Sequence, residues 1–328
     1  MTQRLARLVD TPTVIDLFAG CGGFGSGFAD HGYRITHAVE TFRPSLQTYV
    51  ANVPVDTPLM QDVRKVDTAA MGHPDVVIGG PPCEAFTVAN ADRRKDPVDR
   101  LYHDPVGSLT IQYAILLKHL QPRVFLMENV AGILDGGLEA ELHTIFARAG
   151  YDKIHIHRFL AQDFGTPSYR ERVFISNMPL APKPTTRGQP ITVRDAIGEI
   201  ADLDAHADIP NHQYTPVKGK RGKMLRETGT GKSIYHYKAA DGRTHHVWTR
   251  LPWDQLAPTV KGLSRFIHPE DDRILTVREH ARLMGYPDDY VFHGSRNEAY
   301  NQTGESVPPP LSAALAKAMR VGLDHVEA

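Results

Sequence analysis

The 328 residues are 41% hydrophobic and 23% charged with a formal net charge of −1, which excludes a uniformly basic nucleic-acid binder. No apolar run approaches the roughly 20 residues of a membrane span, so we expect no membrane partner. The two cysteines, Cys21 and Cys83, exclude a disulfide framework and a cysteine-rich zinc cluster; we expect no metal and a cytoplasmic protein. Residues 1–7 contain no apolar run of the length of a secretory signal.

The near-neutral total hides a segregation of charge. Residues 211–270 contain eleven Lys and Arg but only four Asp and Glu, and five histidines as well. A basic segment in an otherwise acidic chain indicates one face for a polyanion. A solvated, lysine-rich loop has the same composition, so charge alone does not decide between the two.

The first predicted element is a strand over residues 13–18, followed by a glycine-rich turn and a helix through residues 26–31. The spacing of Gly20, Gly22 and Gly25 satisfies the dinucleotide-binding fingerprint. Such glycines let the backbone approach a ligand closely, which implies a nucleoside cofactor. An NAD-dependent oxidoreductase is the simplest alternative that this turn allows.

Three further strands follow in the first quarter of the chain. Residues 33–39 predict the second, which ends at Glu40, where a carboxylate can accept hydrogen bonds from ribose hydroxyls. A short third segment ends near Asp62, which can accept from an adenine amino group. The fourth, residues 75–78, leads directly into a turn.

That turn, Gly79-Gly80-Pro81-Pro82-Cys83, is the strongest functional signal. Two glycines release the backbone and two prolines fix it, so the chain is stiff where it delivers Cys83. Cys83 is therefore predicted to be a nucleophile, although most free cysteines are small buried hydrophobes. Residues 84–104 lack a clear period and predict a long functional lid or a disordered connection.

The rest of the chain alternates helices and strands before it turns irregular. Residues 179–190 read as a proline-rich linker, and the segment up to about residue 270 as an irregular recognition unit. The other predicted elements are a helix over 109–120, a strand over 123–127 that delivers Glu128, a helix over 138–149, a hairpin-like pair of strands over 154–160 and 172–176, a helix from Thr276 to Met284, and a last helix over 308–323.

Six sequence blocks, taken together and in order, resemble the DNA (cytosine-5) methyltransferases. One block is weak evidence, but six with the family's order and spacing are specific, and they cover most of the chain apart from the basic segment. The blocks are Asp16–Gly23, Gly80–Cys83, Glu128–Val130, Arg170–Arg172, Arg273–Tyr286 and Gly304–Val307.

The resemblance implies an α/β fold with a doubly wound, mostly parallel sheet and an inserted small, irregular target-recognition domain. It predicts a catalytic and cofactor-binding domain at 1–186, a target-recognition domain with its supporting helix at 187–290, and a C-terminal segment at 291–328 that returns to the first domain. The implied partner is double-stranded DNA. We expect a nucleoid-associated monomer, with a companion restriction enzyme as a possible partner.

The resemblance also assigns chemistry to residues. Cys83 matches the nucleophile that attacks C6 of a flipped cytosine, and Glu128 the residue that grips the N3–N4 edge. Arg172 matches the arginine that holds O2. Arg170 or Arg172 is expected to favour the thiolate form of Cys83.

S-adenosylmethionine is the implied methyl donor. Phe18, Glu40 and Asp62 match its adenosine contacts, and Glu305 matches a position beside its methionine end. The whole set expected to form the cofactor site is Asp16, Phe18, Gly20, Gly22, Gly23, Glu40, Asp62, Pro81, Glu305 and Ser306.

Four positions depart from the family pattern. Glu84 and Glu305 replace a usual Gln and Asn, Val106 an arginine, and Ser168 a Gln. The two glutamates leave open a non-catalytic DNA-binding relative, or an enzyme that acts on RNA or on a modified pyrimidine with an altered donor. We expect ordinary S-adenosylmethionine to remain the donor, because neither change touches Cys83, Glu128 or Arg172.

Overall fold

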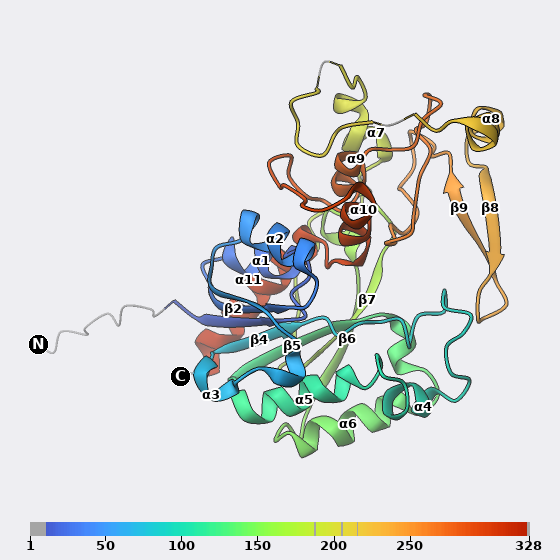
Figure 1. Ribbon diagram of the computed structural model, residues 1–328. Helices are drawn as coiled ribbons and strands as arrows, with labels where there is room; N and C mark the ends of the chain where they lie inside the picture. Colours follow the sequence, from blue (N-terminus) through green and yellow to red (C-terminus); the bar gives the residue numbers. More distant parts are fainter. Residues whose placement is uncertain (1–10, 187, 205, 215, 327–328) are drawn as a thin grey trace, which may run out of the picture.

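The computed structural model describes residues 11–186, 188–204, 206–214 and 216–326 (Figure 1). The expectation about a secretory signal concerns residues 1–7, which lie outside this part. Within these described ranges, no helix has both the length and the apolar character to cross a membrane.

A seven-stranded sheet forms the centre of the larger lobe, in the order β3-β2-β1-β4-β5-β7-β6. Strand β7 lies between β5 and β6 and runs antiparallel to both, whereas the other pairs are parallel. The predicted doubly wound, mostly parallel sheet is thus confirmed. The strands are β1 (Thr13–Leu17), β2 (Arg34–Glu40), β3 (Val55–Met60), β4 (Val76–Gly79), β5 (Val124–Asn129), β6 (His155–Leu160) and β7 (Glu171–Ser176).

Helices cover both faces of this sheet (Figure 1). Because side chains alternate along a strand, Ile15 and Leu17 of β1 pack into one apolar core and Val14 into the other. One face is covered by α1 (Gly23–Ala29), α2 (Arg43–Asn52) and α11 (Pro309–Val326), and the other by α3 (Thr68–Met71), α5 (Leu109–Leu120) and α6 (Leu138–Arg148).

Strand order places the two predicted functional turns side by side. From β1 the chain moves to β2 on one side, while β4 pairs with β1 on the other, so the order reverses between β1 and β4. Leu17 is opposite Gly79, and Gly79 is opposite Met127 of β5. The carboxyl ends of β1, β4 and β5 therefore deliver their turns to one crevice, where doubly wound sheets bind ligands.

A second lobe carries its own apolar core, formed with α7 (Val193–Ile197), α9 (Val277–Arg282) and α10 (Arg296–Glu305). Beyond it lie α8 (Gly219–Glu227) and an antiparallel hairpin, β8 (Ser233–Lys238) with β9 (Thr244–Thr249) (Figure 1). The prediction that this segment is irregular is therefore wrong over α8 and the hairpin.

Other element boundaries also differ from the prediction. Helix α1 starts at Gly23 rather than at residue 26, and the connection 84–104 contains a helix, α4 (Pro97–Tyr102), that starts with an Asp96 cap and a proline. Helix α10 was not predicted. Four short 3₁₀ helices complete the described chain: Val63–Lys65, Ala131–Leu134, Ala161–Phe164 and Gly198–Ile200.

The packing of the apolar cores can be compared with the predicted domains, but it does not test their boundaries. Phe292, Ala299 and Tyr300 pack into the core of the second lobe, although they follow residue 290. Helix α11 packs against α1, as expected for a returning C-terminal segment. The division at residues 186 and 290 stays a prediction.

Helix α9 is anchored by a buried ion pair. Glu279 accepts from the backbone N–H of Thr276, and both its carboxylate oxygens accept from Arg273 at 2.8 Å. The Thr276 hydroxyl accepts from the Glu279 N–H in return, which completes the capping box and confirms Thr276 as the N-cap. Glu279 is fully buried, so its charge depends on Arg273.

We therefore expect Glu279→Gln to lower the free energy of unfolding by about 3 kcal/mol, because the buried Arg273 loses its buried counter-charge and keeps only Asp271, whose side chain is half exposed. Chemical denaturation measures this loss. Glu298→Gln is the matched control, since Glu298 holds the same capping-box position of α10 at the surface. Its denaturation midpoint should stay near that of the wild type. Equal midpoints for all three proteins would contradict the role given to the buried pair.

Candidate active site

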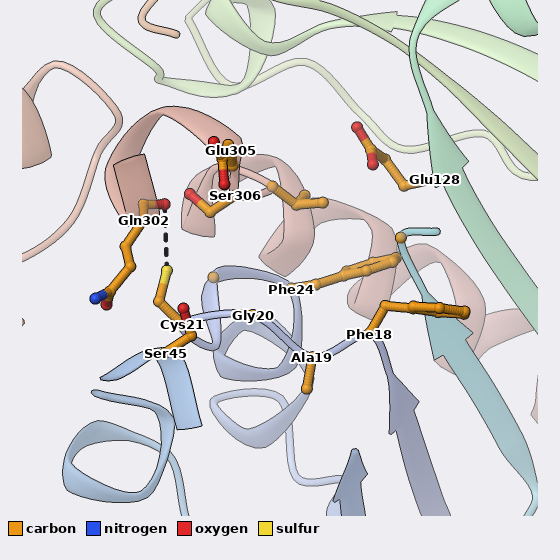
Figure 2. Close-up of a pocket in the computed structure, with 13 residues that line it drawn as sticks. Phe18, Ala19, Gly20, Cys21, Phe24, Ser45, Glu128, Gln302, Glu305 and Ser306 are labelled. Atoms are coloured by element: carbon orange, nitrogen blue, oxygen red, sulfur yellow. Dashed lines mark hydrogen bonds between the residues drawn. The ribbon is translucent and has the colours of Figure 1, made fainter. Parts of the chain in front are cut away.

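A pocket opens where the turn after β1 meets the carboxyl ends of β4 and β5 (Figure 2). Six residues predicted for the site line it: Phe18, Gly20, Gly23, Glu128, Glu305 and Ser306. Seven others that were not among the predicted site residues line it as well: Ala19, Cys21, Phe24, Ser45, Gly80, Gln302 and Val307. The pocket thus combines the first strand's turn with the end of α10.

The glycines of the turn serve different purposes. A Cβ on Gly20, whose φ is +55°, meets no atom within 4 Å, so this position faces open space. A Cβ on Gly23 would overlap the Tyr286 hydroxyl and the Val307 carbonyl, and one on Gly22 would crowd Tyr290. Only Gly20 leaves room for a ligand to approach the backbone closely. Gly22 and Gly23 instead allow the second lobe to pack onto the turn.

Glu40 fixes the turn from the end of β2. One carboxylate oxygen accepts from the Gly20 N–H at 2.9 Å, and the other from the backbone N–H groups of Thr41 and Phe42 at 2.7 and 2.8 Å. The second oxygen also accepts from the Thr41 hydroxyl at 3.3 Å, whereas the oxygen that faces Gly20 accepts only that one bond and keeps a position for a ligand hydroxyl beside the pocket.

Five predicted cofactor residues do not line the pocket: Asp16, Gly22, Glu40, Asp62 and Pro81. Asp16 lies buried beneath the turn, where the Tyr49 hydroxyl donates to it at 3.1 Å, and burial raises the pKa of its carboxyl to about 8. Asp62 caps the helix at Val63–Lys65 and pairs with Arg64, whose hydrogen bonds lower the Asp62 pKa to about 2. The hydrogen bonds of Arg64 account for the Asp62 carboxyl, whereas the second oxygen of Asp16 is buried with no hydrogen-bond partner in the described part of the chain.

The turn that presents Cys83 is held by backbone hydrogen bonds. The Asn129 side chain donates to the carbonyl of Pro81 at 3.1 Å, so Pro81 contributes its backbone rather than a pocket wall. The N–H groups of Phe86 and Thr87 both donate to the Cys83 carbonyl at 2.9 Å. Cys83 is half-buried at the start of this turn.

The Cys83 thiol is protonated at neutral pH in this state. Burial raises its pKa to about 11, and the charges of Glu128 and Glu84 add to the rise. Arg172 and Arg170 oppose it without reversing it. Both arginines therefore favour the thiolate, but the desolvation of the thiol outweighs them.

Glu128 and Arg172 form a close pair next to this turn. The Nε of Arg172 lies 2.9 Å from a carboxylate oxygen of Glu128, and both side chains are nearly buried. Burial raises the pKa of Glu128, whereas Arg172 and Arg170 lower it. A carboxyl whose pKa lies above its usual range can hold a proton and share it with a bound ring nitrogen.

Arg170 was predicted to be catalytic, but its side chain forms buried hydrogen bonds that hold parts of the fold together. Its side chain is fully buried and donates to the backbone carbonyls of Val260, Gly304 and Ser306 at 2.9, 3.0 and 2.7 Å. These carbonyls belong to the second lobe and to the end of α10. Arg170 therefore positions the pocket wall, and Arg172 alone points its charge at Glu128.

A second hollow, lined by cationic residues, lies along the β8–β9 hairpin. No Asp or Glu is among the described residues that line it, and its basic members are Lys232, His236, Arg243, His245, His246, Lys261 and Arg265. At the tip of the hairpin, the Ala240 N–H donates to the Val88 carbonyl at 3.0 Å. The basic segment thus touches the connection that follows Cys83 (Figure 1).

This geometry defines a doubly wound α/β enzyme with a ligand pocket at the topological switch point and a thiol delivered by the neighbouring strand. The positive hollow beside that thiol fits a polyanionic substrate.

The chain belongs to the C-5 cytosine-specific DNA methylase family, whose model matches residues 12–320. A provisionally named type II methyltransferase of Methanocaldococcus jannaschii is 41% identical over 317 residues, covering 94% of this chain and 98% of that protein. The type II methyltransferase M1.HphI of Haemophilus parahaemolyticus is 34% identical, covering 94% of this chain and 86% of that protein. The chain is a DNA (cytosine-5-)-methyltransferase.

A solved structure supports the fold independently. A provisionally named DNA modification methyltransferase encoded within an E. coli prophage superposes with a TM-score of 0.74 at 23% identity, covering 95% of this chain and 99% of that one.

The raised pKa of Cys83 has a direct test. Because alkylation requires the thiolate, the rate of Cys83 modification by iodoacetamide should rise about tenfold per pH unit between about pH 7 and 9 in the free protein. Peptide mass spectrometry separates Cys83 from Cys21, which is only 2% exposed and should stay unmodified. A rate that levels off near neutral pH would show that the thiolate is already formed.

Proposed function

We propose that this enzyme transfers a methyl group from S-adenosylmethionine to C5 of a cytosine flipped out of double-stranded DNA, through a covalent bond between Cys83 Sγ and C6. The observation that carries the proposal is the convergence of the Gly20 turn, the Cys83 turn and the Glu128–Arg172 pair at neighbouring strand ends. Membership of the C-5 cytosine-specific DNA methylase family supports the same class of reaction.

The residues around the pocket fit the proposed donor. Gly20 leaves room for close approach, Glu40 keeps acceptor capacity for ribose hydroxyls, and Phe18 offers a ring to the adenosine part. Glu305 and Ser306 form the wall for the methionine part. When bound, S-adenosylmethionine supplies an electrophilic methyl group on a sulfonium.

The chemistry explains why a thiol and a carboxyl must act together. C5 of cytosine is a weak nucleophile until a group adds to C6. In the proposed reaction Cys83 loses its proton to solvent and its sulfur bonds to C6, while Glu128 gives a proton to N3. After methyl transfer, C5 loses its proton to a base, Cys83 leaves C6, and N3 returns its proton to Glu128.

The neighbours of Glu128 support its part in this scheme. Its raised pKa favours the protonated form that N3 needs, and Arg172, 2.9 Å away, lies where a guanidinium can reach the O2 atom of the same base. The polar edge of the pyrimidine is then read by one acid and one cation. Arg170 keeps its backbone partners and acts as a positioning residue.

The target must leave the helix to reach this pocket, because C6 is inaccessible within a base stack. The positive hollow along β8 and β9 provides phosphate contacts beside the pocket. The connection 84–104, which includes α4, provides the segment that closes over the flipped base. The hydrogen bond from Ala240 to Val88 joins these two parts.

Several wider assignments belong to the same proposal. We infer a catalytic domain at 1–186, a target-recognition domain at 187–290 and a returning segment at 291–328. The names of the relatives, type II methyltransferases, support a restriction-modification setting with a companion restriction enzyme. A monomer in the cytoplasm, associated with the nucleoid, fits an enzyme whose substrate is chromosomal DNA.

Replacement of Cys83 by Ser should abolish turnover, because a serine hydroxyl has no accessible anion near neutral pH. Transfer of a labelled methyl group to DNA measures turnover, and electrophoretic mobility measures binding, which should persist. Substantial methylation by the purified variant would refute Cys83 as the nucleophile.

Removal of pairs among Lys218, Lys220, Arg221 and Lys223 should weaken DNA binding and flatten its dependence on salt. These side chains are exposed on or next to α8. Binding titrations at several salt concentrations give the slope, whose magnitude should fall by about 0.9 for each DNA phosphate that the variant no longer neutralises. The control pair Lys118 and Lys153, exposed on the main lobe, should leave affinity and slope unchanged. If the α8 pairs behave like the control, this helix is only a solvated surface.

A further inference from the structure

The pocket contains a carboxylate that the fold leaves uncompensated. Glu305, the last residue of α10, lines the pocket beside Ser306 (Figure 2). No hydrogen bond or ion pair from the described part of the chain reaches its carboxylate. Arg170 is the cation that acts on it, but both terminal nitrogens of Arg170 donate to backbone carbonyls instead.

The neighbours of Glu305 show where along the pocket it lies. Burial raises the pKa of its carboxyl, and the nearby charges of Glu84 and Glu40 raise it further. Glu84 directly follows Cys83, whereas Glu40 holds the Gly20 turn at the nucleoside end. Glu305 lines the same pocket as Gly20, at the nucleoside end, and Gly80, in the turn that leads to Cys83, so it belongs to the stretch that joins the two ends.

The covalent structure of the donor places its sulfur in the same stretch. The sulfur of S-adenosylmethionine links the nucleoside to the methyl group that must reach the base held by Cys83. It carries a positive charge before transfer and none afterwards, when the product S-adenosylhomocysteine contains a neutral thioether. The rest of the two molecules is the same.

On the basis of the proposed function, we propose that Glu305 is a specificity-determining residue that favours the sulfonium donor over its neutral thioether product. An ionised Glu305 attracts the sulfonium but gains nothing from the thioether. Its effects on the amino and carboxylate groups are common to both molecules and cancel in the ratio of their dissociation constants. Compared with a neutral side chain, the charged one therefore raises the preference of the site for the donor over the product.

Isothermal titration of each compound into the purified enzyme tests this without any turnover. In Glu305→Gln, which keeps the shape but removes the charge, the ratio of the product's Kd to the donor's Kd should fall at least about fivefold. Glu298→Gln removes the same charge from the first turn of the same helix, outside the pocket, and should keep the ratio within about twofold of the wild type. Circular dichroism establishes that each variant is folded.

A charged analogue gives a second readout. Sinefungin, which has an amine-bearing carbon in place of the methylated sulfur, should behave like the donor and lose affinity relative to the product in Glu305→Gln. An unchanged ratio, or equal gains for donor and product, would overturn the assignment of Glu305 while leaving the donor itself in place. A wild-type protein that binds none of the three compounds would contradict the donor assignment and the role of Glu305 together.

Discussion

The arrangement of the site depends on the three backbone hydrogen bonds of Arg170. A guanidinium without access to water is stable only when its terminal N–H groups find acceptors, and here carbonyls from two separate segments provide them. Gly304 approaches the backbone of Lys261 so closely that a Cβ would overlap it. One buried cation at the start of β7 thereby fixes the end of α10, the segment at Val260 and the pocket wall at Ser306. The block Arg170–Arg172, which resembles the family, thus contains two arginines with different tasks. Arg170 holds the pocket wall, and Arg172 pairs with Glu128.

The central strands β1, β4 and β5 were predictable because each contains a short apolar run. Helix α5 was predicted with its observed bounds, since apolar residues recur there at helical spacing. Helix α10 was not, because its residues are mostly polar and show no apolar stripe. Its capping box, Ser295 with Glu298, was the available signal. The β8–β9 hairpin was signalled by Asp241-Gly242, which a search for apolar alternation passes over.

The site residues also differ in how far the local sequence determines their contacts. Cys83 and Glu128 follow strands that the order of the sheet makes neighbours, so the sequence blocks sufficed to bring them together. The acceptors of Arg170 lie 90 to 136 residues away in the chain, and no local pattern announces them. Asp16 was chosen from the block that resembles the family and Asp62 for its place after a strand, but their nearest donors, Tyr49 and Arg64, are set by the fold.

The electrostatics of the resting site suit a nucleophile that is switched on by its substrate. Burial holds Cys83 as a thiol, and the charge of Glu128 disfavours its ionisation, while burial also raises the pKa of Glu128. Two acids that each oppose the other's ionisation cannot both lose their protons cheaply in a dry pocket. In the proposed reaction a base that enters the pocket presents N3 to Glu128, which gives up its proton as sulfur bonds to C6. The negative charge that would be costly on sulfur then ends on the Glu128 carboxylate, 2.9 Å from Arg172, so the thiol stays unreactive until a cytosine is in place.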